Sequence, residues 1–411
     1  MEGFGNNNNK QLNTQEKNRL LKLGVSHQSS GDIDSAKKTY ELFLSKGFTD
    51  ASLMVNLALI YSKSKNTKDA ISLLKKTINL FPNKIEALLI LGSELFNSNE
   101  LLESEKVFKK AIDIDPKNIS AYGNLSTLYT NQGKYLKAEE CLKKIIQLNP
   151  RLSIAYANLG AILRDQGNLK ESELVLREAL RIDPKLYNAY SNLAMILLSK
   201  REVINAEKLI RKAISINPKI PIAYSNLAWI LNDQAKLEEA KVIAEKSLQL
   251  NPNLFEGYSI LGKILISQGK LVEGEESLLK AISIKNHYSN PYFQLSRLSK
   301  SKRLIQIKKL VLSLDDNNFK KPIEKSEIYF AKSNILHGES NYMESSENLL
   351  KANNLKLSIY PSEANEAIAF TNQILNETKN LTVNNDTKDS IINSIFIVGL
   401  PGCGATLFES N

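Results

Sequence analysis

Residues 153–186 read SIAYANLGAILRDQGNLKESELVLREALRIDPKL, and residues 187–220, YNAYSNLAMILLSKREVINAEKLIRKAISINPKI, repeat the same pattern. In both stretches leucine is the seventh residue, a small residue is the eighth, and proline is the thirty-second. The proline recurs every 34 residues in both directions, at positions 82, 116, 150, 184, 218 and 252. This period predicts a repeat protein.

Each repeat is predicted to fold into a pair of helices. Leu159 and Leu163 lie four residues apart, which places them on one helix face. The turn DQGNL contains Gly167, which is able to take the positive φ that ends a helix. The proline then ends the second helix because it cannot continue one. The predicted fold class is therefore all-α, a solenoid of helical hairpins.

The repeat register divides the chain into segments. Residues 1–16 are expected to be a disordered N-terminus, and 17–288 eight repeats. The predicted repeats are 17–50, 51–84, 85–118, 119–152, 153–186, 187–220, 221–254 and 255–288. Degenerate helices of the same kind are expected over 289–375, with a last hairpin at 326–357, followed by a polar linker over 376–394. A strand, loop and helix start are expected over 395–411.

The columns of leucine, small residue, tyrosine or leucine, alanine and proline at a period of 34 resemble the tetratricopeptide-repeat family. The resemblance covers about two thirds of the chain. It implies that the hairpins stack into a superhelix whose first helices line a concave groove for a peptide or protein.

One column on the first helices is uniform: Asn56, Asn124, Asn158, Asn192 and Asn226. Asparagine is a poor helix former, and a primary amide both donates and accepts hydrogen bonds. This row is predicted to pair with the backbone of an extended peptide, and it resembles the asparagine row of O-linked N-acetylglucosamine transferases. Arg164, Asp165, Trp229 and Asp233 are expected to add selectivity. The alternative is that the asparagines bond to neighbouring helices.

Composition excludes several other classes of protein. The chain has 54 basic and 44 acidic residues, a net charge of +10, but the lysines recur beside glutamates as on a solvated helix face. Nucleic acid is therefore not predicted as a partner. No metal site is predicted, because His27, His287 and His337 stand alone. No segment has the length and apolarity of a signal peptide or membrane span, and with two distant cysteines the prediction is a cytoplasmic protein.

A short apolar run, IFIV, precedes a glycine-rich loop near the end of the sequence. Backbone N–H groups of such a loop are able to face an anion. Gly399, Pro401, Gly404, Thr406 and Leu407 fit the pattern of the 5′-phosphosulfate loop, and the segment resembles sulfotransferases. At three positions it departs from that family: Gly402 replaces a basic residue, Cys403 a serine, and Ala405 a threonine.

The resemblance implies 3′-phosphoadenylyl sulfate as a cofactor, held by residues 399 and 401–406. The expected function is the acceptor-holding arm of a tetratricopeptide-repeat sulfotransferase whose catalytic domain is missing from these 411 residues, so that this chain itself is inactive. Two alternatives stay open. One is an active sulfotransferase acting on a protein tyrosine or another hydroxyl. The other is a free-standing adaptor, or a scaffold like that of the N-acetylglucosamine transferases.

Overall fold

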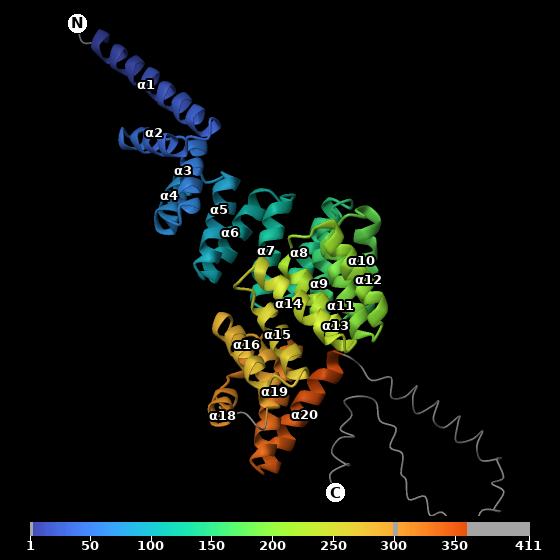
Figure 1. The fold of residues 1–411 in the computed structure, drawn as a ribbon. Coiled ribbons are helices and arrows are strands. Elements are labelled where there is room, and N and C mark those ends of the chain that lie inside the picture. Colours follow the sequence, from blue (N-terminus) through green and yellow to red (C-terminus); the bar gives the residue numbers. More distant parts are fainter. Residues whose placement is uncertain (1–2, 299–302, 360–411) are drawn as a thin grey trace, which may run out of the picture. The chain divides into compact units, whose positions relative to one another are not determined.

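The computed structural model describes residues 3–298 and 303–359, and every regular element within these ranges is a helix (Figure 1). All of them belong to the first of two compact units, Met1–Tyr360. The prediction of an all-α solenoid is thereby confirmed for the described residues. The linker expected at 376–394 and the strand and loop expected at 395–411 lie outside the described residues, as does the end of the expected helical segment, 360–375.

Seven successive hairpins share one plan, a first helix of 13 residues and a second helix of 14 residues. Their first helices begin at residues 51, 85, 119, 153, 187, 221 and 255, where the predicted repeats start. The pairs are α3 (Ala51–Lys63) with α4 (Thr67–Leu80), α5 (Ile85–Asn97) with α6 (Leu101–Ile114), α7 (Ile119–Asn131) with α8 (Tyr135–Leu148), α9 (Ser153–Asp165) with α10 (Leu169–Ile182), α11 (Tyr187–Ser199) with α12 (Val203–Ile216), α13 (Pro221–Asp233) with α14 (Leu237–Leu250), and α15 (Phe255–Ser267) with α16 (Leu271–Ile284).

The hairpins before and after this series are less regular. At the start, α1 (Gly3–Ser29) pairs with α2 (Ile33–Ser45). The helix α1 begins at Gly3, so it runs through the segment 1–16 that the sequence analysis expected to be disordered. Extending an existing helix adds a hydrogen bond for each residue, whereas starting one is costly. After α16 follow α17 (Ser289–Ser296), α18 (Leu304–Leu312), the short 3₁₀ helix η1 (Asp316–Asn318), α19 (Pro322–Gly338) and α20 (Tyr342–Ile359).

The turn inside each hairpin has one residue with positive φ. At Gly133, Gly167 and Gly269 the angle is 72°, 88° and 79°, and the value at Gly167 confirms the positive φ that the sequence predicted there. Lys65, Asn99, Arg201 and Ala235 take the same conformation at the equivalent place without being glycine. A side chain in this region costs roughly 1 kcal/mol or more. The packing of the two helices therefore imposes the turn even where the local sequence opposes it.

Small residues set the distance between paired helices. Ser172 of α10 is fully buried and donates a hydrogen bond from Oγ to the carbonyl oxygen of Gly160 in α9, at 2.5 Å. Ser104 bonds to the carbonyl of Gly92 in the same way at 2.7 Å. A Cβ placed on Gly160 would come within 2.5 Å of Leu176 Cγ. These small residues therefore let the two helices of a hairpin approach closely.

Candidate functional site

The first helices form one continuous layer. The first helices from α3 to α15 pack on the second helix of their own hairpin and of the preceding one, and several also contact the first helix of the next hairpin, as α9 contacts α11 and α11 contacts α13. We call the exposed side of this layer, which carries the asparagine row, the first-helix face. A solenoid presents such a repeated surface to its ligands.

Two members of the asparagine row are bonded within the chain. Asn192 Oδ1 accepts a hydrogen bond from Arg164 Nη1 at 2.9 Å. Asn226 Nδ2 donates to Ser191 Oγ at 3.2 Å. At the far end of the row, Asn56 lies beside the Tyr40 hydroxyl; burial raises the pKa of Tyr40, and the contact with Asn56 opposes this. For these three residues, the alternative of bonds to neighbouring helices describes the structure.

Asn124 and Asn158 differ from the rest of the row. Within residues 3–298 and 303–359, neither side-chain amide has a hydrogen-bonding partner. Asn158 is exposed and Asn124 is half-buried. The two residues occupy the same position of α7 and α9, which are first helices of adjacent hairpins. They leave four amide N–H donors and two acceptor oxygens for a ligand.

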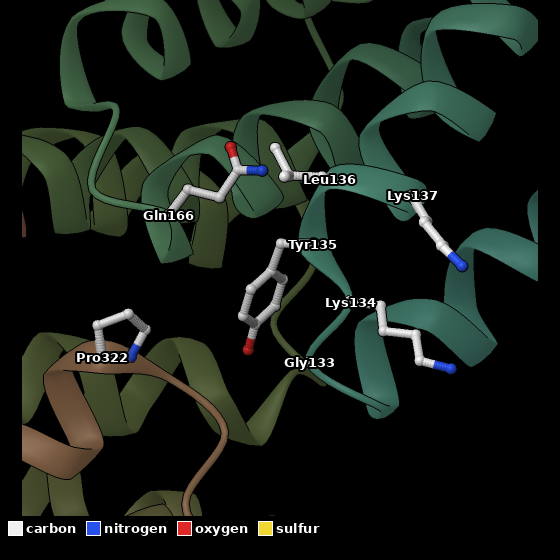
Figure 2. Close-up of a pocket in the computed structure, with 7 residues that line it drawn as sticks. All are labelled: Gly133, Lys134, Tyr135, Leu136, Lys137, Gln166 and Pro322. Carbon is white, nitrogen blue, oxygen red and sulfur yellow. The ribbon is translucent and has the colours of Figure 1, made fainter.

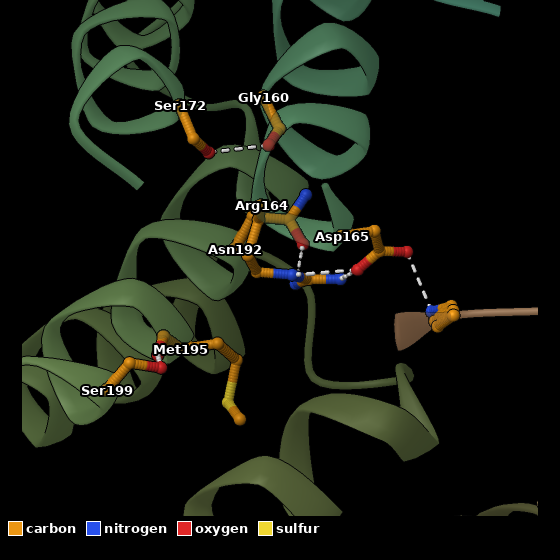
Figure 3. A network of polar contacts seen from close by, with 8 residues as sticks. Gly160, Arg164, Asp165, Ser172, Asn192, Met195 and Ser199 are labelled. Atoms are coloured by element: carbon orange, nitrogen blue, oxygen red, sulfur yellow. Dashed lines mark hydrogen bonds and ion pairs between the residues drawn. The ribbon is translucent and has the colours of Figure 1, made fainter. Parts of the chain in front are cut away.

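A charged network follows Asn158 on the same helix (Figure 3). Arg164 donates from Nε and Nη2 to Asp165 Oδ1, at 3.3 and 3.0 Å. Lys321 Nζ lies 2.7 Å from the other carboxylate oxygen, Oδ2. Burial of Asp165, whose side chain is 15% exposed, raises its pKa, but the charges of Arg164 and Lys321 outweigh burial and hold the pKa below its ordinary value. The carboxylate is therefore ionised and fully paired at neutral pH.

A pocket lies next to this network (Figure 2). The turn after α7 and the start of α8 form one side of it, and Pro322, the first residue of α19, forms another. The Tyr135 ring points toward the segment that carries Pro322. Its lining residues are Gly133, Lys134, Tyr135, Leu136, Lys137, Gln166 and Pro322. Sequence reasoning missed this pocket because Pro322 comes from a hairpin far along the chain.

Trp229 stands further along the first-helix face, on α13. It packs against the buried cluster around Leu227, Ala228 and Ile230, and Lys263 Nζ lies 4.6 Å from its ring centroid. The same lysine is 3.1 Å from Asp233 Oδ1. Trp229 and Asp233 thus share one cation, Lys263, and no contact joins them to Arg164 among the described residues.

Other kinds of site have little support in the described part of the chain. No group of three or more His, Cys, Asp or Glu side chains in it is arranged to hold a metal ion. No helix there is long and apolar enough to cross a membrane. Cys141 is buried, and burial raises the pKa of its thiol to about 11. The predicted cofactor loop, Gly399, Pro401, Gly402, Cys403, Gly404, Ala405 and Thr406, lies outside the described residues.

Comparison with known families supports the repeat assignment. The family described as the cilia and flagella-associated protein 70 C-terminal domain matches residues 6–219, and the tetratricopeptide-repeat family matches residues 222–251. The chain is thus a tetratricopeptide-repeat protein. Both matches lie within the helical hairpins, and neither includes the loop at 399–407. No curated protein sequence matches the chain.

Solved structures share the fold. A tetratricopeptide-repeat protein from Parabacteroides merdae is 20% identical, with a TM-score of 0.51, and the match covers 64% of this chain and 99% of that one. PilF from Pseudomonas aeruginosa is 17% identical with a TM-score of 0.42, over 52% of this chain and 97% of that one. At 20% identity, the similarity to the Parabacteroides merdae protein shows a shared fold and nothing more.

Proposed function

The chain belongs to the family of the cilia and flagella-associated protein 70 C-terminal domain, and on that premise we propose that it is a scaffold that binds an extended peptide or protein segment along its first-helix face. Tetratricopeptide repeats bind peptides or proteins as a class. The observation that carries the proposal is the pair of unbonded amides, Asn124 and Asn158, on adjacent first helices.

The geometry of these two amides suits a polypeptide backbone. Helices α7 and α9 both pack on α8, so an extended chain that crosses them, advancing roughly 3.3–3.6 Å per residue, presents successive backbone groups to the two amides. Each amide is able to donate and to accept, which satisfies a backbone without reading its side chains. Asn192 and Asn226 extend the row but must first exchange their present partners, Arg164 and Ser191.

A displayed library of random dodecapeptides supplies the ligand for a test. Peptides selected on the full chain are titrated against the double variant Asn124→Ala, Asn158→Ala. Two lost hydrogen bonds are worth roughly 1–3 kcal/mol in all, so Kd should rise about tenfold. Asn205→Ala is the matched control, because Asn205 lies exposed on the second helix α12.

Circular dichroism establishes that the variants fold. If the selected peptides bind the double variant as tightly as they bind the unchanged chain, the proposed role of the asparagine row is wrong. Failure to select any peptide at all would contradict the scaffold function itself.

The second candidate function, sulfuryl transfer from 3′-phosphoadenylyl sulfate, rests on the sequence of residues 399–407 alone. In this proposal the backbone of the loop holds the donor. Because residue 402 is glycine and not a basic residue, the loop lacks a charge-assisted hydrogen bond to the donor, which is worth roughly 1.5–3 kcal/mol. Calorimetry with the donor tests it. Gly402→Arg should tighten donor binding at least about tenfold if the loop binds the donor, and absence of binding to both proteins would eliminate this candidate.

A further inference from the structure

The last hairpin of the described chain touches the turns of two hairpins much earlier in the sequence. Lys321, just before α19, forms the ion pair with Asp165, and Pro322 lines the pocket beside Tyr135. At the other end of the hairpin, Ile359 of α20 lies so close to Gly167 that a Cβ there would be 2.9 Å from the Ile359 Cα. The α19–α20 hairpin thus contacts the α7–α8 and α9–α10 turns.

Asp165 lies at a position that is unfavourable for a carboxylate. It is the last residue of α9, where the partial negative charge of the helix C-terminus disfavours a carboxylate. Asp233 occupies the last place of α13, two hairpins on, and it holds Lys263 at 3.1 Å. In both cases a lysine from another helix or loop compensates the carboxylate. An acidic group kept at an unfavourable position is often explained by function rather than by stability.

The contact between the α19–α20 hairpin and these turns is separate from the core that folds the hairpin. In the described residues, the buried cluster from Leu278 to Ile335 joins α16 through α19 and contains no residue of α7–α10. The helices α19 and α20 pack mainly on each other, and α19 also packs on α17 and α18. The cluster that holds α19 to α16–α18 therefore stays buried if the hairpin leaves the turns, and the buried residue of the hairpin that becomes exposed at Gly167 is Ile359.

We propose that Asp165 anchors a lysine subsite of the first-helix face, and that Lys321 occupies this subsite until a lysine-bearing peptide displaces the α19–α20 hairpin. Pro322 follows Lys321 directly and forms one wall of the pocket opposite the turn that carries Tyr135, so a peptide that replaces this segment carries lysine followed by proline or another small apolar residue. Arg164 holds the carboxylate in place through Oδ1 and leaves Oδ2 for the incoming cation. This inference rests on the proposed peptide-binding function.

The chain's own segment is the natural probe for a test. A fluorescein-labelled peptide of residues 317–325, NNFKKPIEK, is titrated by anisotropy against the full chain. A tethered segment competes at an effective concentration in the millimolar range, so Lys321→Gln should bind the probe about tenfold more tightly than the unchanged chain. Adding Asp165→Asn to Lys321→Gln should remove that gain, and so should glutamine in place of the second lysine of the probe.

Lys332→Gln is the matched control. Lys332 lies on the same helix, α19, but pairs with Asp316 rather than with the early turns. This variant should bind the probe like the unchanged chain. Melting temperatures of all variants, followed by circular dichroism, separate binding effects from folding effects.

Several outcomes would overturn the inference. If Lys321→Gln lowers the melting temperature without tightening probe binding, the hairpin is a structural clasp. If no variant binds the probe, the proposed lysine subsite is also wrong. If library-selected peptides depend on Asn124 and Asn158 but not on Asp165 or Lys321, the scaffold function stands and only the lysine subsite fails.

Discussion

At the scale of single residues, two glycines on first helices have opposite roles. Gly160 lies where α9 meets α10, and a Cβ there would stand 2.5 Å from Leu176 Cγ and 2.7 Å from Cδ2. Leu176 is fully buried. Gly123, on α7, has no atom within 4 Å of its Cβ position. The first glycine is required by packing, whereas the second is not.

We therefore expect Gly160→Ala and Gly123→Ala to change stability in opposite directions. Overpacking costs roughly 1–3 kcal/mol, which exceeds the gain of about 0.5–1 kcal/mol from replacing a helical glycine. Gly160→Ala should lower the free energy of unfolding, and Gly123→Ala should raise it by about that smaller gain. Urea unfolding followed by circular dichroism measures both. Equal effects of the two changes would show that the contact with Leu176 does not limit helix approach.

At the scale of helices, polar bonds recur between neighbouring hairpins. Gln166 Nε2 donates to Glu139 at 3.0 Å and Gln234 Nε2 donates to Glu207 at 2.8 Å, in each case across 27 residues. Lys200 replaces the glutamine in the hairpin between them and bonds to Glu173. Each bond joins the end of a first helix to the second helix of the preceding hairpin. The repeat spacing encodes these contacts, so they could have been predicted from the sequence.

The bond at Glu207 predicts how stability depends on pH. Burial raises the pKa of this carboxyl, but the bonds from Gln234 and Arg211 outweigh burial and hold the pKa below its ordinary value of 4.5. A lowered folded-state pKa means that the charged form stabilises the fold above pH 4.5, and that this stability is lost as pH falls through the folded-state pKa. Glu207→Gln should cost about 1 kcal/mol at pH 7 and lose less stability on acidification.

Thermal melts between pH 7 and pH 3 measure this dependence. Glu202→Gln on the same hairpin is the control, because Glu202 is exposed and, within residues 3–298 and 303–359, its carboxylate bonds only to Asn205, a helix neighbour; its effect should stay within about 0.5 kcal/mol. If Glu207→Gln has the same acid profile as the unchanged chain, the carboxylate does not link the hairpins.

At the scale of the described unit, the core is a series of clusters rather than one centre. Buried residues group around Leu20 to Ala121, Phe108 to Leu163, Ala157 to Ile196, Ala194 to Ile264 and Leu278 to Ile335. The first four clusters overlap in sequence with their neighbours, but distant ones share no side chains among the described residues. Stability in such an array is a sum of local terms and nearest-neighbour interfaces.

This arrangement predicts that distant hairpins unfold with separate transitions. Trp229 is the only tryptophan in the sequence and reports on the cluster from Ala194 to Ile264. Leu57→Ala, in the first cluster, should cost roughly 2–5 kcal/mol and shift the loss of helix signal while leaving the tryptophan fluorescence midpoint in place. Leu227→Ala, beside Trp229, should shift the fluorescence midpoint. Coincident shifts of both signals in Leu57→Ala would indicate one cooperative unit.

The sequence by itself determined the repeat, the start of each regular first helix, the turn glycines and the small packing positions. These features are local, since each depends on residues within one hairpin or its neighbour, and the period of 34 carries them along the chain. Only the tertiary structure decided which members of the asparagine row stay unbonded, and that Lys321 meets Asp165. The meeting of such distant hairpins depends on the small rotation between successive hairpins, summed over all those between them, and no single stretch of sequence contains that sum.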